Sequence, residues 1–285
     1  MTEIMNKKIS ILGCGWLGLP LAKSLISKSY EVKGSTTSES KLEILKNAGI
    51  SPFQIQLEEN QIVGNIEDFL KETDVLIVDI PPGLRREVST SNEMTFVNKV
   101  KTLIPYIEKS GVQKVIFVSS TSVYGDSYNF STSLEVTEET KPNPDTESGK
   151  QLVIAETLLQ SNSYFKTTII RFGGLLGDDR HPVKFLAGRT NVENPDAPVN
   201  MIQREDCIGV IEKALDFARN DNWEWNQTFN TVAPQHPTRK AYYHKKAENL
   251  NLPLPIFAEN LESKGKIISS KKVETILGYS FQQEI

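Results

Sequence analysis

Three glycines with a fixed spacing, Gly13, Gly15 and Gly18, lie in the sequence GCGWLG near the N-terminus. Lys8–Leu12 before them has the pattern of a strand, and residues 17–27 after them have apolar residues at helical spacing. A GxGxxG motif between a strand and a helix is typical of dinucleotide binding, because its glycines permit a tight turn and close approach of a pyrophosphate. The N–H groups and dipole of the helix N-terminus would attract the phosphates. The predicted cofactor contacts in this loop are Gly13, Cys14, Gly15, Trp16, Leu17 and Gly18.

The end of the second expected strand bears on the choice between NAD and NADP. An acidic residue there would bind the ribose 2′-hydroxyl of NAD. This chain instead has the sequence GSTTS at residues 34–38, followed by Lys41. Because hydroxyls and a nearby cation suit a 2′-phosphate better, we favour NADP(H), with NAD as the alternative and with Ser35, Thr36 and Thr37 as contacts. The same residues could simply begin a helix.

A second motif, VSSTSVYG at residues 118–125, follows an apolar run. With this motif the sequence resembles the extended short-chain dehydrogenase/reductase superfamily, the NAD(P)-dependent epimerase/dehydratase family, and within it the atypical YeeZ-like group. Four further segments resemble the family in the same order, at residues 96–103, 171–174, 199–206 and 266–279. The resemblance therefore covers nearly the whole chain. It implies an NAD(P) cofactor and a substrate lobe built from separate pieces.

The resemblance also implies catalytic residues. In the family, the lysine of a Tyr-x-x-x-Lys pair holds the nicotinamide ribose, the tyrosine exchanges a proton with the substrate, and a serine orients the substrate oxygen. Carried over to this chain, Ser120 matches the serine, Lys150 the lysine, and Asn98 an active-site asparagine. The tyrosine position is Thr146. Because the pKa of a threonine hydroxyl lies far above neutral, it cannot replace a phenolate near pH 7.

Two other side chains could replace the missing phenol. They are Tyr124, in the second motif, and Glu147, beside the altered tyrosine position. For Tyr124, a structural hydroxyl packed against the loop is the alternative. The family's sugar-nucleotide dehydratases carry an Asp-Glu pair where this chain has Thr121 and Ser122, so dehydration by that route is disfavoured.

These features predict an NAD(P)-dependent oxidoreductase or epimerase that acts on a small polar or sugar-like substrate with a non-standard active site. Because Thr146 stands at the position of the family's catalytic tyrosine, the alternative function is an NADP(H)-binding sensor or regulatory protein without redox turnover. A hydroxyacid dehydrogenase would share GxGxxG, but it would not explain VSSTSVYG.

Several further residues have two interpretations. Besides Lys150, further cofactor contacts are expected at Pro81, Pro82, Phe172 and Gly173. Arg85 and Arg86 could touch a cofactor phosphate or only begin a loop. A basic cluster could bind an anionic substrate or be a solvated loop; it comprises Arg180, His181, Lys184 and Arg189. Cys14 could be a redox-sensitive thiol or merely a small residue beside the cofactor.

Strand-like and helix-like segments alternate along the chain. The expected strands are Lys8–Leu12, Tyr30–Gly34, Phe53–Leu57, Val75–Ile80, Val115–Val118, Thr167–Phe172 and Thr228–Thr231. This alternation predicts an α/β fold, a doubly wound parallel sheet of the Rossmann type with a small interleaved C-terminal substrate lobe. We expect residues 7–172 and 200–232 to form the NAD(P)-binding domain, and residues 173–199 and 233–285 the substrate-binding lobe.

Composition narrows the class of protein. The 285 residues are 38% hydrophobic and 24% charged, which is typical of a soluble globular chain. The net charge of −4 argues against nucleic-acid binding. No apolar run reaches the roughly 20 residues that span a membrane, and no secretion signal is recognised, so the expected location is cytoplasmic. The two cysteines and three histidines lack the spacing of a metal site, so we expect no bound metal. The expected partner is a small-molecule substrate, and the sequence leaves open whether the protein forms an oligomer.

Overall fold

The structure is a computed structural model and describes residues 7–83, 94–126, 135–217, 225–259 and 262–285. Seven strands form one sheet in the order β11-β8-β7-β6-β1-β2-β3. Their bounds are β1 (Lys8–Leu12), β2 (Glu31–Thr36), β3 (Ser51–Gln54), β6 (Val75–Val78), β7 (Lys114–Ser120), β8 (Lys166–Phe172) and β11 (Thr228–Thr231). Chain order and spatial order differ at β1 and β6, which is where a doubly wound sheet reverses direction.

The centre of the sheet is apolar on both faces. All four residues of β6, with the sequence VLIV, are buried, as a strand covered by helices on both sides requires. β1 pairs in parallel with β6, with Ile9 opposite Val75 and Leu12 opposite Val78. The β1–β2, β2–β3 and β6–β7 pairs are parallel as well. The carboxyl ends of these strands therefore meet at one edge of the sheet.

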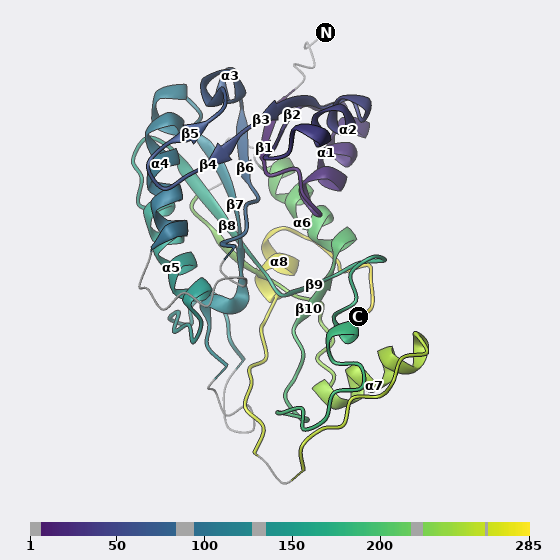
Figure 1. The fold of residues 1–285 in the computed structure, drawn as a ribbon. Coiled ribbons are helices and arrows are strands. Elements are labelled where there is room, and N and C mark those ends of the chain that lie inside the picture. Colours follow the sequence, from purple (N-terminus) through teal and green to yellow (C-terminus); the bar gives the residue numbers. More distant parts are fainter. Residues whose placement is uncertain (1–6, 84–93, 127–134, 218–224, 260–261) are drawn as a thin grey trace. The chain divides into compact units, whose positions relative to one another are not determined.

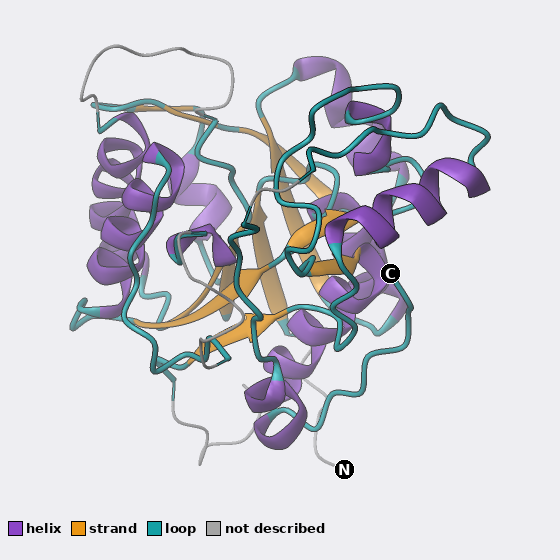
Figure 2. Ribbon diagram, turned by 90° about the horizontal axis from the view of Figure 1, so that it is seen from below, coloured by secondary structure: helices purple, strands orange, loops and turns teal. Residues whose placement is uncertain are grey.

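Helices cover this sheet. Those that alternate with its strands are α1 (Gly18–Ser27), α2 (Leu42–Asn47), α3 (Ile66–Leu70), α4 (Thr95–Ser110), α5 (Glu147–Gln160) and α6 (Arg204–Phe217). Figure 1 shows α4 and α5 side by side on one face of the strands and α1 on the other. In Figure 2 the strands run between helices. Gly111 ends α4 in the left-handed conformation, at φ 79°. The predicted α/β class with a doubly wound parallel sheet is confirmed.

The chain divides into two compact units. The first comprises residues 1–120, 147–170 and 215–228, and the second residues 121–146, 171–214 and 229–285. The second unit thus takes in residues 121–146 and 200–214, which the sequence analysis gave to the cofactor domain. A role of the second unit in substrate binding stays a prediction.

The second unit has its own small elements and core. β9 (Gly174–Leu176) and β10 (Met201–Gln203) pair in parallel, and α7 (Arg239–Asn249) begins at Thr238, whose hydroxyl accepts a hydrogen bond from Ala241 N. This unit also contains two 3₁₀ turns, η2 (Thr121–Val123) and η3 (Pro182–Phe185), and the helix α8 (Lys271–Ile276). The core comprises Leu176, Val183, Val192, Val199, Met201, Ala233, Tyr242, Tyr243, Ala247, Phe257 and Ile285.

Short elements differ from the sequence-based expectation. The strand expected over Phe53–Leu57 is split, because β3 ends at Gln54 and β4 (Gln56–Leu57) pairs with β5 (Ile62–Val63) in an antiparallel hairpin. A short 3₁₀ turn, η1 (Glu39–Lys41), directly precedes α2. These differences leave the carboxyl edge of the sheet unchanged.

Candidate functional site

The glycine turn between β1 and α1 is as tight as the motif predicts. Gly13 has φ 113°, and a Cβ added there would lie 2.2 Å from the carbonyl oxygen of Asp79. A Cβ on Gly18 would lie 2.2 Å from the carbonyl oxygen of Gly13. Both positions therefore require glycine, one for its backbone conformation and both for the close approach of other backbone atoms.

Gly15 has the opposite surroundings. It is exposed, and a Cβ added there would meet nothing within 4 Å. Protein packing does not explain a glycine at this position. The open space in front of it, at the start of α1, is where a phosphate could approach the backbone.

A carboxylate from a neighbouring strand lies behind this turn. Asp79 directly follows β6, and its side chain accepts a hydrogen bond from Gly18 N–H. Helix α1 has neither a capping hydrogen bond from Leu17 nor an acidic residue in its first turn, so Asp79 supplies this negative group. Burial raises the pKa of Asp79 to about 7, against the lowering effect of the Gly18 hydrogen bond. The sequence analysis missed Asp79, although an acidic residue straight after a buried parallel strand is a usable signal.

Ser35 holds the glycine turn from β2. Its side chain is buried, and its Oγ accepts a hydrogen bond from Gly13 N at 2.9 Å. Its carbonyl oxygen accepts a second from Cys14 N at 2.7 Å. Thr36 is also buried, and its hydroxyl accepts from Ser38 N. Of the three residues predicted to contact a 2′-phosphate, only Thr37 is exposed.

The Cys14 thiol is enclosed. Its side chain is 4% exposed, and a Cβ on Gly34 would lie 2.5 Å from its sulfur. Burial, with a smaller contribution from the Asp79 charge, raises the pKa of Cys14 to about 12. Because the thiolate is the reactive form, this environment favours the packing interpretation over a redox-sensitive thiol.

Three predicted catalytic residues lie in the first unit. Ser120 ends β7 and is partly exposed, and Lys150 lies exposed in the first turn of α5. Lys150 Nζ is 3.7 Å from a carboxylate oxygen of Glu147, so the carboxylate considered as a replacement acid points toward this lysine. Asn98, on α4, donates a hydrogen bond to Glu59 at 2.9 Å.

The Tyr124 hydroxyl is already engaged in the second unit. The side chain is 1% exposed, and its hydroxyl accepts a hydrogen bond from Arg171 at 2.6 Å. The same oxygen lies 3.1 Å from Thr137 O and 3.1 Å from Asn230 Oδ1. Burial raises the pKa of Tyr124, against the charge of Arg171, which lowers it. This geometry favours a structural hydroxyl over a general acid.

The sequence that begins at the glycine turn matches a known protein family. Residues 13–216 match the model of an NAD(P)H-binding family. The chain is also 34% identical over 278 residues to Protein YeeZ of Escherichia coli K12, covering 97% of this chain and 96% of the relative. The chain belongs to the NAD(P)H-binding family. The predicted resemblance, including that to the YeeZ-like group, is thereby confirmed.

Solved structures agree on the fold of this NAD(P)H-binding protein. UDP-glucose 4-epimerase of Thermotoga maritima, solved with UDP-glucose, matches with a TM-score of 0.76 at 16% identity, covering 97% of this chain and 94% of that chain. A short-chain dehydrogenase/reductase superfamily protein of Agrobacterium tumefaciens with bound NAD matches with a TM-score of 0.75 at 18% identity, covering 97% and 93%.

Other residues predicted to contact NAD(P) have mixed surroundings. Pro81 is exposed and Pro82 partly exposed, beyond the end of β6. Phe172 is buried, and a Cβ on Gly173 would lie 2.6 Å from both Asn200 O and Val232 Cγ1. Packing within the second unit therefore accounts for glycine at position 173. Arg85 and Arg86 lie outside the described residues.

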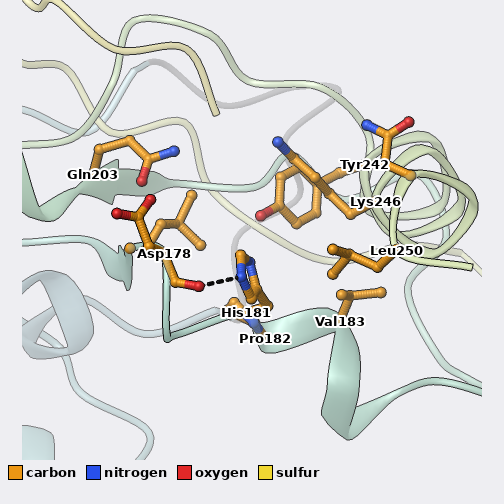
Figure 3. A pocket seen from close by; sticks show the side chains of 11 residues that line it. Asp178, His181, Pro182, Val183, Gln203, Tyr242, Lys246 and Leu250 are labelled. Carbon is orange, nitrogen blue, oxygen red and sulfur yellow. Dashed lines mark hydrogen bonds between the residues drawn. The ribbon is translucent and has the colours of Figure 1, made fainter. Parts of the chain in front are cut away.

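The basic cluster predicted for an anionic substrate is spread out. Arg180, Lys184 and Arg189 are exposed, and only His181 lines a pocket of about 190 Å³ in the second unit. Figure 3 shows His181 bonded to the Asp178 carbonyl oxygen, at 2.7 Å. Tyr242 and Lys246, from α7, close another side of the pocket.

The described ranges contain neither a metal-binding cluster nor a membrane-spanning helix. There, no three His, Cys, Asp or Glu side chains are grouped so that they could hold a metal ion. Neither does any described helix combine the length and apolarity that crossing a membrane requires. The two cysteines, Cys14 and Cys207, are both buried and unbridged.

Proposed function

We propose that the protein is an NADP(H)-dependent oxidoreductase or epimerase that acts on a small polar, sugar-like substrate. The observation that carries the proposal is the glycine turn. Gly13 and Gly18 are required by packing, whereas Gly15 faces open space at the start of α1. A turn that packing alone had shaped would not need its middle glycine, but one that admits a pyrophosphate does.

The residues of the first unit suit such chemistry. When bound, a nicotinamide ring supplies or accepts a hydride. Ser120, at the carboxyl end of β7, would donate a hydrogen bond that orients the substrate oxygen. Lys150, exposed in the first turn of α5, would hold the nicotinamide ribose through its ammonium group. Asn98 would act in positioning only, since its amide already donates to Glu59.

The choice of NADP over NAD rests on fewer residues than the sequence indicated. Because Ser35 faces the glycine turn, we take Thr37 and Lys41, which are exposed beyond β2, as the groups that would meet a 2′-phosphate. A hydroxyl and an ammonium group both donate to phosphate oxygens, and no carboxylate competes before Glu39. This supports NADP(H) as the preferred cofactor.

The substrate class is proposed from the structural relatives. The Thermotoga maritima epimerase was solved with UDP-glucose, a sugar nucleotide. The second unit of this chain supplies a pocket with hydrogen-bonding groups at Asp178, Gln203 and Asn249, and apolar groups at Val183 and Leu250. Such mixed linings suit a polar ring with one apolar face.

A second candidate function is a NADP(H)-binding sensor without turnover. Thr146 cannot act as a phenolate, and the Tyr124 hydroxyl is held by Arg171 within the second unit. Glu147 points toward Lys150. A protein that binds the cofactor but lacks a proton donor would report the ratio of NADPH to NADP rather than change it.

Cofactor titration followed by turnover separates these functions. NADPH and NADH are titrated by their fluorescence, and a panel of sugars, sugar nucleotides and small hydroxy compounds is then tested for cofactor-dependent change. Lys150→Ala should abolish turnover, whereas Lys166→Ala, an exposed lysine at the opposite edge of the sheet, should not. Binding without turnover would favour the sensor. Failure to bind either cofactor would exclude both functions.

A further inference from the structure

The Asp79 carboxyl lies against the turn that would hold the cofactor phosphates. Its backbone N–H donates to Leu12 O at 2.9 Å, and its carbonyl oxygen occupies the space that a Cβ on Gly13 would need. Its side chain accepts from Gly18 N–H and comes within 3.2 Å of the position of a Gly18 Cβ. These contacts fix the carboxyl from both its backbone and its side chain. The group cannot move away without opening the turn.

Among the described residues, no opposite charge offsets this carboxylate. Of the described groups that face it, Cys14 from the glycine turn is titratable, and its raised pKa keeps the thiol neutral. Ser35, at the end of β2, is neutral and bonds to Gly13 N of the same turn. Within the described chain, no Lys, Arg or His contributes to the environment of Asp79. Hydrogen bonding to Gly18 is thus its main stabilisation when ionised.

A pyrophosphate in the glycine turn would add negative charge beside it. Two anions close together in a partly dry site disfavour each other, and the group that can take up a proton does so. We propose that Asp79 takes up one proton from solvent when the cofactor pyrophosphate binds to the glycine turn. The inference rests on the proposed cofactor binding and adds a role that the glycine motif alone does not contain.

Protonation would leave the contact with Gly18 in place. The neutral carboxylic acid has one O–H donor and keeps a carbonyl oxygen as acceptor. The acceptor oxygen can retain the hydrogen bond from Gly18 N–H, and the proton removes the negative charge that would lie beside the pyrophosphate. The step therefore forms one O–H bond at Asp79 with a proton from water or buffer. The hydronium ion or buffer acid that supplies this proton loses one bond to hydrogen, and no bond to carbon changes.

Cofactor affinity should accordingly depend on pH. Below neutral pH, Asp79 is already largely protonated, because burial raises its pKa to about 7. Above neutral pH each binding event must take up a proton, so Kd should rise by up to about tenfold per pH unit. NADH is the better probe, since the 2′-phosphate of NADPH titrates near pH 6 on its own.

The experiment measures NADH and NADPH dissociation constants by fluorescence between about pH 6 and pH 9. The wild-type Kd for NADH should be level at the acid end and should rise above neutral pH. Asp79→Asn should bind with a Kd that is independent of pH, because the amide keeps both donor and acceptor without titrating. Asp74→Asn is the matched control, since Asp74 lies just before β6 and its exposed carboxylate accepts from Lys8 N. It should keep the wild-type profile.

Isothermal calorimetry gives a second readout that needs no variant. Binding heats in two buffers of different ionisation enthalpy should show nearly one proton taken up per NADH at pH 8 to 9, and almost none near pH 5 to 6. A wild-type Kd that is level across the range, or an Asp79→Asn profile that keeps the wild-type slope, would overturn the inference alone. Absence of any binding would overturn the proposed cofactor function and the inference together.

Discussion

Arg171 donates a hydrogen bond from Nη1 to the Tyr124 hydroxyl across 2.6 Å, and both side chains are buried in the second unit. The hydroxyl hydrogen is then left for Thr137 O or Asn230 Oδ1, each at 3.1 Å. Its hydrogen-bonding capacity is therefore largely used by the protein. A tyrosine that supplied a substrate proton would have to give up one of these partners.

Tyr124→Phe tests this structural role. Removing the hydroxyl leaves a buried guanidinium with one acceptor fewer, so we expect the free energy of unfolding to fall by about 1–3 kcal/mol. Cofactor affinity should not change. Urea unfolding and NADPH titration measure the two effects, and Tyr164→Phe is the matched control, because that side chain is 69% exposed. Unchanged stability with loss of turnover would instead identify Tyr124 as the acid.

The glycine turn allows a paired test. Gly15→Ala adds a methyl group where nothing lies within 4 Å, so stability should change by less than about 1 kcal/mol while NADPH affinity falls by tenfold or more. Gly18→Ala places a methyl group 2.2 Å from the Gly13 carbonyl oxygen. This variant should lose NADPH affinity too, and in addition its fold should be destabilised by roughly 1–3 kcal/mol. Thermal unfolding with and without NADPH separates the two effects. If Gly15→Ala binds normally, the phosphates do not occupy the space in front of Gly15.

The main strands of the central sheet are predictable from local sequence patterns. Lys8–Leu12 and Thr228–Thr231 have the bounds that the sequence indicated, and the buried run around β6 marks the sheet centre. These signals depend only on which residues are apolar and how they are spaced. By contrast, β9 and β10 are three residues each and pair across about 25 residues of irregular chain. Such short segments carry too little pattern to identify a partner.

The position of the glycine turn was predictable from the sequence, but the directions of the side chains around it were not. The motif located the turn at Gly13–Gly18, but it did not indicate that the Ser35 side chain, predicted to contact a 2′-phosphate, bonds to Gly13 of that turn. Which face of a strand a residue lies on depends on pairing with a distant strand. The place of Asp79 after a buried strand marks it as a candidate, but its contact with Gly18 joins residues 61 positions apart and no local pattern indicates it.

Cofactor selectivity should depend on Thr37 more than on Ser35. Thr37→Asp places a carboxylate where a 2′-phosphate is proposed, so NADPH affinity should fall by tenfold or more and NADH affinity should hold or rise. Ser35→Ala removes the acceptor of Gly13 N–H and should weaken both cofactors alike. Fluorescence titration with both cofactors gives the ratio. Equal losses of NADPH and NADH in Thr37→Asp would exclude this residue from 2′-phosphate recognition.

Asp79 also predicts how stability varies with pH in the absence of cofactor. Its pKa rises from 3.8 in the unfolded chain to about 7 in the folded one, so the folded state holds the proton more firmly. Stability from this group is complete below pH 3.8 and is lost as the pH rises to 7, by up to roughly 4 kcal/mol. Asp79→Asn should lack this decline, so its stability relative to wild type should increase between pH 5 and pH 8 in urea unfolding. A constant difference between the two proteins would contradict the raised pKa.

The altered tyrosine position gives the most direct test of turnover. Thr146 is exposed and lies directly before α5, four residues ahead of Lys150. Thr146→Tyr would restore the family's Tyr-x-x-x-Lys spacing, and Lys150 would lower the phenol pKa as a nearby cation does. If the protein is a sensor that has lost its proton donor, this variant should gain NADPH-dependent turnover on a substrate panel, by tenfold or more over wild type. Thr146→Phe, which supplies the ring without the hydroxyl, should gain nothing. If wild type already turns over and Thr146→Tyr slows it, the threonine belongs to a working site whose proton donor is another group.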